Sequence, residues 1–271
     1  MKVDFDVAGK IAVITGAGGI ICGVMAREMA AKGMKVALLD LFEDKAQAIA
    51  DEINAAGGTA IACKANVLDR ESLEEAKKYV LEKFGTIDVL INGAGGNKKG
   101  ATTSAEQDFF HIGVEDLRWV FDLNVMGAVL TTQVFGAVLA EKKDGNVINI
   151  ASMASMIPLT NTIAYSGAKA AVANFTQWMA VHFNQNYSTN IRVNAIAPGF
   201  LLTTQNQFLM QKEDGSPTER GQKVLNKTPM ARYGEPQEMA GPVIWLCSEA
   251  ASFVNGAVIP IDGGFSAYWG V

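Results

Sequence analysis

Short apolar runs alternate along the chain with longer stretches in which apolar residues recur every three or four positions. KIAVIT (residues 10–15) and KVALLD (residues 35–40) are apolar runs of the kind found in buried parallel strands. Between them, residues 19–32 carry small and apolar side chains at helical spacing and are followed by Gly33, a residue type that often ends helices. The pattern predicts a strand, a helix and a second strand.

The same alternation continues to the end of the chain. We predict further helices over 43–56, 70–84, 117–141, 164–185 and 235–248, and further strands over 59–64, 88–91, 146–150, 191–197 and 257–261. Parallel neighbouring strands need helical crossovers. The pattern therefore predicts an α/β fold, a Rossmann-like doubly wound parallel sheet of about seven strands with helices on both faces. No linker-like stretch divides the chain, and we predict one domain over residues 1–271.

Two stretches are too irregular to belong to this scaffold. Residues 95–112 and 200–234 each follow a predicted strand. In doubly wound sheets, ligands bind beyond the carboxyl ends of the strands. We therefore expect both stretches to be loops over that edge that contact a substrate.

The composition indicates a large apolar core and a mildly acidic surface. Of the 271 residues, 49% are hydrophobic, and the net charge is −5. The lysines are mixed with acidic residues along helical faces, as in KKYVLEK, which argues against nucleic acid as a partner. No apolar run reaches the roughly 20 residues of a membrane span, and no signal-peptide pattern precedes the first strand. We expect a cytoplasmic protein without a membrane partner.

The three cysteines do not form a metal or disulfide pattern. Cys22, Cys63 and Cys247 are widely spaced, and neither a C-x-x-C pair nor a Cys/His cluster occurs. We expect them to be buried as small apolar side chains in a reducing compartment, and we expect no metal site.

A glycine-rich turn follows the first predicted strand, in the sequence TGAGGIICG from Thr15 to Gly23. Such a turn lets the backbone approach a pyrophosphate and points helix N–H groups at it, although a plain tight turn would use the same residues. The second predicted strand ends in Asp40, where an acidic side chain can accept the ribose hydroxyls of NAD or stand at a helix N-terminus. No arginine is nearby to bind the 2′-phosphate of NADP, so we expect NAD.

Tyr165 and Lys169 carry the candidate chemistry. They lie four positions apart in YSGAK, on one face of a predicted helix. A nearby ammonium favours the phenolate and would lower the pKa of the tyrosine toward the value that a general acid/base needs. The pair Tyr79 and Lys83 has the same spacing, but it lies on a charged helix away from the carboxyl edge. We interpret that pair as part of a solvated surface.

Ser152 comes just after the predicted strand NVINI. A serine at this position is often a helix cap. Because the strand's carboxyl end also faces the expected ligand edge, its hydroxyl could hydrogen-bond a reacting oxygen. Together with Tyr165, Lys169 and the glycine-rich turn, this position predicts a catalytic serine.

These motifs belong to a longer set with a specific order. In chain order, the set comprises the Thr15-Gly16 turn, Asp40, the segment NGAG at 92–95, Asn124, Ser152, Tyr165 with Lys169, and Pro198-Gly199 followed by Thr203. With this set, the chain resembles the short-chain dehydrogenase/reductase family over essentially its whole length.

The resemblance implies a role for each motif. Tyr165 would be the acid/base and Ser152 would orient the substrate oxygen. Lys169 would hold the nicotinamide ribose and lower the tyrosine pKa, and Asn124 would kink its helix and hold a water in a proton relay. The implied NAD site comprises Gly16, Gly18, Gly19, Ile21, Asp40, Asn66, Val67, Ala94, Tyr165, Lys169, Pro198, Gly199 and Thr203, with Pro198-Gly199 seating the nicotinamide.

Three segments depart from the family pattern. Ile20 and Cys22 stand where the second and third glycines of G-x-x-x-G-x-G are usual. Asn66 stands where an aspartate is usual near the adenine. Gly93 replaces the second asparagine of Asn-Asn-Ala-Gly, which removes a side-chain hydrogen bond near the cofactor.

A narrower resemblance concerns the substrate. The combination of TGAGGIICG, NGAGGN, FTQWMA, IAPGF and DGGFSAYWGV is similar to the subgroup that interconverts D-mannonate and D-fructuronate, with gluconate 5-dehydrogenases as relatives. It implies an oxidoreductase that interconverts a secondary alcohol and a ketone on a sugar acid. The alternatives are the same chemistry on gluconate, a steroid, an acyl thioester or a polyol, and a non-catalytic NAD-binding sensor. A sensor would not need the complete catalytic set.

The loop after the fourth predicted strand offers an anion site. Asn97, Lys98 and Lys99 follow this strand closely, so one lysine could hold a substrate carboxylate while the amide binds hydroxyls. A solvated loop with two lysines is the alternative.

We also predict a homo-oligomer, and the family resemblance implies a homotetramer. The helices over 117–141 and 164–185 are apolar round more than one face, which favours a dimer interface. The tail over 262–271 carries Phe265, Tyr268 and Trp269, which favour a second interface unless they fold back onto their own subunit.

Overall fold

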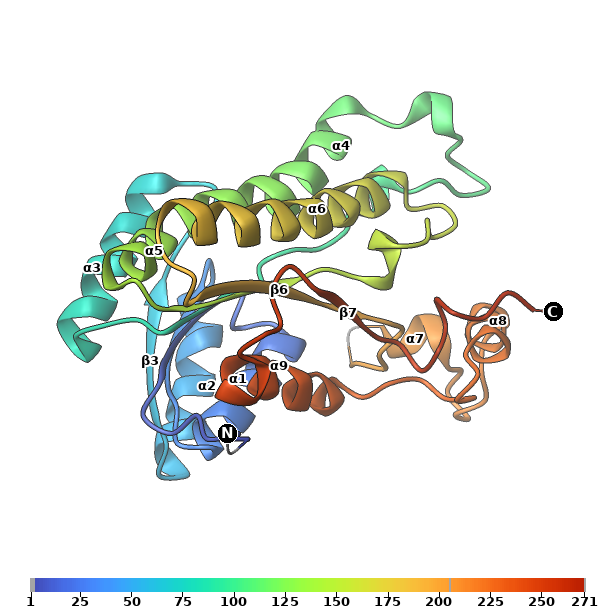
Figure 1. Ribbon diagram of the computed structural model, residues 1–271. Helices are drawn as coiled ribbons and strands as arrows, with labels where there is room; N and C mark the ends of the chain where they lie inside the picture. Colours follow the sequence, from blue (N-terminus) through green and yellow to red (C-terminus); the bar gives the residue numbers. More distant parts are fainter. Residues whose placement is uncertain (1–2, 205, 271) are drawn as a thin grey trace.

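The apolar runs of the sequence form one parallel sheet (Figure 1). The computed structural model describes residues 3–204 and 206–270, and within these ranges seven strands lie in the order β3–β2–β1–β4–β5–β6–β7. They are β1 (Ile11–Thr15), β2 (Lys35–Asp40), β3 (Thr59–Lys64), β4 (Val89–Asn92), β5 (Gly145–Ile150), β6 (Ile191–Pro198) and β7 (Val258–Ile261). The strand order reverses between β1 and β4, which opens a crevice at their carboxyl ends.

Helices cover both faces of the sheet (Figure 1). One layer consists of α1 (Ile20–Ala31), α2 (Glu43–Ala55) and α9 (Ala240–Cys247), and the other of α3 (Arg70–Phe84), α5 (Gly127–Lys142) and α6 (Ile163–Asn186). Alternate strand residues serve the two layers: Ile14 packs with the first and Val13 with the second, and both are fully buried. The single-domain, doubly wound fold predicted from the sequence is confirmed.

The predicted helix over 117–141 has an irregular centre. It consists of α4 (Val114–Phe121), a π-helical turn (Asp122–Met126) and α5. A π turn holds one residue more than an α-helical turn and frequently occurs at functional sites. Asn124 lies within it.

This helical run also qualifies as a membrane span by length and composition alone. It extends over Val114–Lys142, contrary to our expectation that no stretch would be long and apolar enough. Half of its most apolar window is buried inside the molecule. A core helix passes the same test, because it is apolar toward both the sheet and its neighbouring helices.

The two stretches predicted as loops differ from each other. Residues 95–112 contain only short 3₁₀ turns, at Lys99–Ala101 and Phe109–His111. The stretch over 200–234 was wrongly predicted to be irregular throughout, because α7 (Gln207–Met210) and α8 (Glu219–Lys227) lie in it. The side chain of Thr218 accepts a hydrogen bond from Gly221 N at 3.0 Å and caps α8. Residue 205 lies outside the described residues.

The aromatic tail folds back in part onto its own subunit. Phe265 is buried, packs edge to face on Phe200 with 5.2 Å between ring centroids, and lies under the Lys227 ammonium. The expectation that Phe265 is uncovered is therefore wrong. Trp269 is 81% exposed, and Val271 lies outside the described residues.

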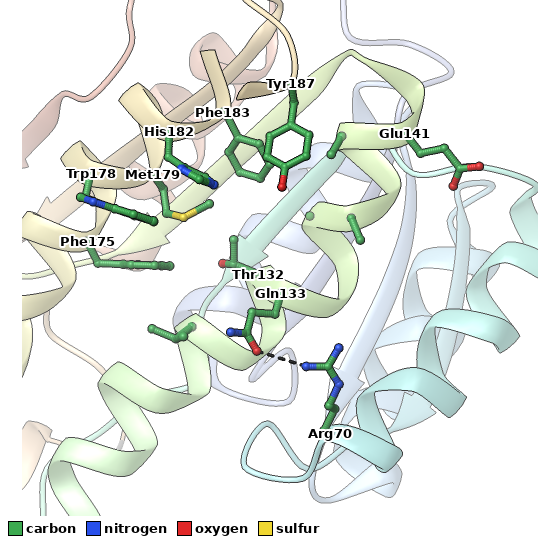
Figure 2. A pocket seen from close by; sticks show the side chains of 14 residues that line it. Arg70, Thr132, Gln133, Glu141, Phe175, Trp178, Met179, His182, Phe183 and Tyr187 are labelled. Carbon is green, nitrogen blue, oxygen red and sulfur yellow. Dashed lines mark hydrogen bonds between the residues drawn. The ribbon is translucent and has the colours of Figure 1, made fainter. Parts of the chain in front are cut away.

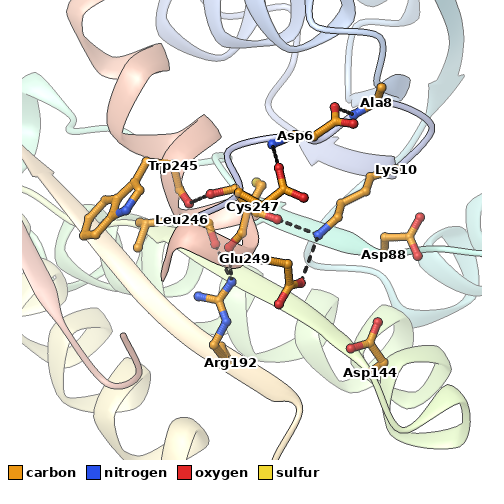
Figure 3. A network of polar contacts seen from close by, with 12 residues as sticks. Asp6, Ala8, Lys10, Asp88, Asp144, Arg192, Trp245, Leu246, Cys247 and Glu249 are labelled. Carbon is orange, nitrogen blue, oxygen red and sulfur yellow. Dashed lines mark hydrogen bonds and ion pairs between the residues drawn. The ribbon is translucent and has the colours of Figure 1, made fainter. Parts of the chain in front are cut away.

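Two cations close the carboxyl end of α9 (Figure 3). The guanidinium of Arg192, on β6, donates to the carbonyl of Leu246 at 2.7 Å and to those of Ser248 and Val254 at 3.3 Å. The Lys10 ammonium donates to the carbonyl of Cys247 at 2.7 Å. They satisfy carbonyls that a helix end leaves without partners and place positive charge at the negative end of the helix dipole.

The cysteines are free thiols among the described residues. Cys22 and Cys247 are buried, as expected, whereas Cys63 on β3 is partly exposed.

Candidate active site

The predicted functional residues gather at the carboxyl edge of the sheet. Each follows or ends a strand, except Asn124 in the π turn and Tyr165 and Lys169 near the start of α6. The strands bring together the glycine-rich turn after β1, Asp40 at the end of β2, Asn66-Val67 after β3, Ala94 after β4, Ser152 after β5, and Pro198, Gly199 and Thr203 at the end of β6.

The glycine-rich turn lies directly against the segment after β4. Gly16 has φ +65°, and a Cβ on it would lie 2.8 Å from the backbone of Ala94, so this position requires glycine. The helix α1 begins after Gly19 without a side-chain cap. Its first-turn N–H groups, including that of Ile21, therefore point from an uncapped helix end toward the crevice and can bind a phosphate.

Asp40 connects the end of β2 to this turn. One carboxylate oxygen accepts from Gly18 N at 2.9 Å, and the other accepts from Phe42 N at 2.9 Å. A carboxylate oxygen can accept further hydrogen bonds, because each has two lone pairs. Asp40 therefore fixes the turn and can still accept hydroxyl donors.

Two other predicted cofactor residues take part in hydrogen bonds between a backbone N–H and a side-chain oxygen. Asn66 Oδ1 accepts from Leu68 N at 3.0 Å, and Val67 is buried. Thr203 N donates to Asn206 Oδ1 at 2.8 Å, which fixes the start of the segment after β6.

Ser152, just after β5, and Tyr165, near the start of α6, face each other. Burial raises the pKa of Tyr165 above its ordinary value, and a hydrogen bond with the Ser152 side chain opposes this rise. Ser152 is also a cap, because its Oγ accepts from Ala154 N at 3.1 Å. The two interpretations of this serine are thus compatible. A phenol beside a fixed hydroxyl can exchange a proton with an oxygen that both contact.

Lys169 is a buried cation tied to the sheet. Its ammonium donates to the carbonyl of Ile150 at 2.7 Å and lies 5.6 Å from the centre of the Tyr165 ring. Burial lowers the pKa of Lys169 to about 8. We expected the lysine to lower the tyrosine pKa, but in this structure burial raises that pKa and the opposing contribution comes from Ser152.

Asn124 joins the π turn to the loop after β4. Its Nδ2 donates to the carbonyls of Gly96 at 2.7 Å and Val120 at 2.8 Å, and its Oδ1 accepts from Gly96 N at 3.2 Å. The side chain therefore holds the loop directly. The widened helical turn agrees with the expected kink.

The second tyrosine–lysine pair, which has the same sequence spacing as Tyr165 and Lys169, lies on a different helix. Tyr79 and Lys83 are on α3, where Lys83 is exposed and its ammonium lies 5.5 Å from the centre of the Tyr79 ring. This contact is local to the helix surface.

The three candidate substrate residues are all exposed. Asn97 Nδ2 donates to Thr102 Oγ1 at 3.2 Å. Lys98 pairs with Asp116 of α4, whereas Lys99 begins a 3₁₀ turn. Asp116 was not singled out in the sequence, because nothing in the pattern relates it to the loop.

Buried polar side chains that were not predicted support the site from below. Asn92 Nδ2 donates to Thr132 Oγ1 at 2.9 Å and to Asn149 Oδ1 at 2.8 Å, and Asn149 Nδ2 donates to Thr176 Oγ1 at 2.8 Å. This chain links β4 and β5 to α5 and α6. The signal in the sequence is an asparagine inside an otherwise apolar strand, as in NVINI.

Thr15 is a second supporting residue. It is buried, and its Oγ1 accepts from Gly93 N at 3.1 Å and from Ala94 N at 3.3 Å. It fixes the ends of β1 and β4 side by side. With the uncapped start of α1, the close approach at Gly16 and the Asp40 carboxylate, this edge fits a dinucleotide. Among the described residues, no cluster of three or more His, Cys, Asp or Glu is placed to hold a metal ion.

Comparison with known proteins also indicates an oxidoreductase. A family profile described as enoyl-(acyl carrier protein) reductase matches residues 16–266. An uncharacterized oxidoreductase, UxuB, of Bacillus subtilis (strain 168) is 50% identical over 98% of both chains. The 7alpha-hydroxysteroid dehydrogenase of Escherichia coli (strain K12) is 33% identical over 94% of both chains.

A solved structure is also similar over nearly the whole molecule. It is a provisionally named D-mannonate oxidoreductase from Haemophilus influenza with bound NAD, which is 45% identical, has a TM-score of 0.92, and covers 98% of both chains. The match of the family profile and of these relatives extends over the glycine-rich turn, the serine, the tyrosine and the lysine described above. The chain belongs to the short-chain dehydrogenase/reductase family of oxidoreductases.

Proposed function

We propose that the protein is an NAD-dependent dehydrogenase that interconverts a secondary alcohol and a ketone on a sugar acid, with D-mannonate and D-fructuronate as the pair. The observation that carries the proposal is the meeting of Ser152, Tyr165 and Lys169 at the carboxyl edge, beside the glycine-rich turn. The 45% identity to a provisionally named D-mannonate oxidoreductase supports the substrate.

The reaction follows from the positions of the side chains. NAD, when bound, supplies the hydride acceptor for the alcohol or, as NADH, the hydride donor for the ketone. Tyr165 takes the hydroxyl proton in alcohol oxidation and returns a proton to the carbonyl oxygen in ketone reduction. Ser152 holds that oxygen by a hydrogen bond, and the Lys169 ammonium places positive charge beside the phenol.

NAD is favoured over NADP by the charge at the end of β2. Asp40 would accept the ribose hydroxyls, whereas a 2′-phosphate would meet its carboxylate. The bound NAD in the Haemophilus influenza structure supports this assignment. The residues that would hold NAD are those predicted from the sequence.

A sugar acid is favoured over a steroid by similarity and by charge. The steroid dehydrogenase shares 33% identity with the chain, less than the provisionally named mannonate oxidoreductase. The loop after β4 offers Asn97, Lys98 and Lys99 to a carboxylate and hydroxyls, and residues 200–234 would complete the site. Gluconate or a neutral polyol, and a non-catalytic NAD-binding sensor, are the alternatives.

The experiment is an assay of purified protein with a panel of aldonates, ketouronates, polyols and a hydroxysteroid, each with NAD(H) and NADP(H). The proposal requires D-fructuronate reduction with NADH, or D-mannonate oxidation with NAD, to have the highest kcat/KM. A higher kcat/KM for a neutral polyol would contradict the sugar-acid substrate, while the assignment to the dehydrogenases would still hold. NAD binding without turnover of any substrate would favour the sensor.

We further propose that the protein is a cytoplasmic homotetramer. The outer faces of α5 and α6 enclose an apolar groove of about 650 Å³ (Figure 2). Phe175, Trp178 and Met179 of α6 line it, and Trp178 stacks on His182 with 4.6 Å between ring centroids. An exposed apolar face on two long helices favours pairing with a second copy of the same face. The exposed Trp269 in the tail supports a second contact.

A further inference from the structure

Cys22 and Gly93 are matched in size across the junction of α1 and β4. Cys22, in the first turn of α1, is buried, and a Cβ on Gly93 would overlap its Sγ. The Cβ of Cys22 lies 3.7 Å from the same point, which is an ordinary contact distance. The thiol and the backbone carbonyl of Thr15, 2.6 Å from the same point, therefore both occupy space that a side chain at position 93 would need.

The segment that begins at Gly93 leads directly to the catalytic groups. A Cβ on Gly95 would lie 2.6 Å from Asn124 Oδ1 and 3.3 Å from Lys169 Nζ, so this backbone passes close to both side chains. Asn124 in turn holds Gly96 by hydrogen bonds in both directions. A shift of the backbone at Gly93 would move the segment against Lys169 and Asn124.

We propose that Cys22 and Gly93 act as one compensated pair of positioning residues, in which the cysteine side chain sets the distance between the nucleotide-binding turn and the segment that holds Asn124 and Lys169. The cysteine at position 22 and the glycine at position 93 both depart from the family pattern. On this proposal the two departures belong together, because side-chain volume lost after β4 is replaced by side-chain volume on α1. The inference rests on the proposed NAD-dependent function.

The thiol acts through its volume. Burial raises the pKa of Cys22 to about 12, so it stays neutral at working pH. Protein interiors are close-packed, and changes as small as one or two heavy atoms are felt by the neighbours. Overfilling this space should therefore shift the nucleotide-binding turn more than emptying it does.

A double-mutant cycle tests the pair. Gly93→Ala is made in the wild type and in Cys22→Ala, and NAD affinity is measured by calorimetry without substrate. The new methyl group meets Sγ only when Cys22 is present, whereas its close approach to the Thr15 carbonyl, 2.6 Å, is common to both backgrounds and cancels. We expect Gly93→Ala to weaken NAD binding about tenfold more in the wild type than in Cys22→Ala. Equal weakening in both backgrounds overturns the pair.

Further variants distinguish a positioning role of Cys22 from an effect on stability alone. Cys22→Val overfills the space beside the native Gly93 and should weaken NAD binding about tenfold, while Cys22→Ala changes it less than about threefold. This comparison decides the proposal if Gly93→Ala does not fold, and equal affinities overturn it. Cys247→Val is the matched control, a buried thiol on α9. It should lower Tm without changing NAD affinity.

The kinetic readout tests the connection to Lys169. Cys22→Val should lower kcat for ketone reduction and shift its pH profile, because the lysine beside the phenol moves. An unchanged kcat and pH profile, with only Tm lowered, would reduce the pair to a packing contact. If the wild type turns over no ketouronate, the proposed substrate fails, but the calorimetric cycle still decides the pair.

Discussion

Lys98 and Asp116 form an ion pair of 2.6 Å between Nζ and Oδ1 that ties the loop after β4 to helix α4. The Lys98 ammonium also lies 5.8 Å from the centre of the Trp119 ring. Its charge is therefore already matched by a carboxylate, although 46% of the side chain is exposed. The neighbouring Lys99 is the better candidate to bind a substrate carboxylate.

We accordingly expect Lys99→Ala to raise KM for the sugar acid selectively. Removing an exposed charge pair should change KM about fivefold, with kcat and the KM for a neutral polyol little changed. Raising the salt concentration should also raise the KM of the wild type for the acid, because salt screens the charge of Lys99. Lys98→Ala is the matched variant. If neither variant affects the acid, the lysine site is wrong.

Tyr165→Phe should lower kcat by about 10²–10⁴-fold, because it removes the group that exchanges the proton. NAD affinity, measured by calorimetry, should stay within about threefold of the wild type. Tyr79→Phe, with the same sequence spacing to a lysine, should have wild-type activity. Retention of most activity by Tyr165→Phe would remove this tyrosine from the mechanism.

The raised pKa of Tyr165 also predicts opposite pH dependences for the two directions. A raised pKa keeps the phenol protonated through neutral pH, which suits proton donation to a ketone. Alcohol oxidation needs the phenolate, so its kcat should still be rising at the ordinary tyrosine pKa of about 10, while ketone reduction should fall only above that pH. Parallel profiles in both directions would contradict the assignment.

The position of Asp40 predicts the cofactor preference. Asp40→Ala should weaken NAD binding by about 1.5–3 kcal/mol and reduce the discrimination against NADP, because it removes charge-assisted hydrogen bonds to the ribose. Part of this loss reflects the turn, since Asp40 also accepts from Gly18 N. Asp40→Asn keeps an acceptor for Gly18 and should lose less. A wild type that uses NADPH faster than NADH would reject the assignment.

The sequence predicted the strands well because the central ones are short apolar runs buried on both faces, although the edge strands β3 and β7 are only partly buried. The bounds of β1 and β5 differ from the prediction by one residue, and those of β2 and β3 agree. The helices α7 and α8 were missed because both are short: α7 has four residues, and the large apolar residues of α8, Val224 and Leu225, are adjacent and give no helical repeat. The π turn at Asn124 was not visible, since one extra residue in a helical turn hardly changes the apolar pattern.

The candidate site could also be predicted from the sequence only in part. The order of motifs placed Ser152, Tyr165 and Lys169 at one edge, because parallel strands end on the same side of a sheet. The partners of individual side chains depend on packing between distant segments. Neither the pairing of Lys98 with Asp116 nor the fit of Cys22 beside Gly93 has a signal in the local sequence.

Arg192 is not part of the candidate active site, but we expect it to contribute to the stability of the fold. Arg192→Met removes the donor to three carbonyls near the end of α9. It leaves the buried carbonyl of Leu246 without a partner, whereas those of Ser248 and Val254 still accept from Ala251 N and Asn194 Nδ2. We expect the free energy of unfolding to fall by about 1–3 kcal/mol in urea denaturation. Lys10→Met, which affects one carbonyl at a more exposed position, should cost less. A loss below about 0.5 kcal/mol for Arg192→Met would show that the carbonyls are otherwise satisfied.

The last prediction concerns the groove between α5 and α6. Trp178 is 57% exposed in the isolated chain and lies on the apolar wall of the groove (Figure 2). Trp178→Glu would place a charge within the face that the proposed second copy would cover, and like charges would then meet across a two-fold axis. We expect the wild type to be a tetramer by light scattering at micromolar concentration, and this variant to dissociate to dimers.

Trp269→Glu provides the comparison, because Trp269 is 81% exposed and lies in the tail, on a different part of the surface. Two separate interfaces are needed to build a closed tetramer with dihedral symmetry, so each single variant should leave dimers held by the other interface. The double variant should then be a monomer. A wild type that is itself monomeric at micromolar concentration would end the idea, because the exposed tryptophans would then have no second copy to cover them. A tetramer unaffected by either variant would place its interfaces elsewhere.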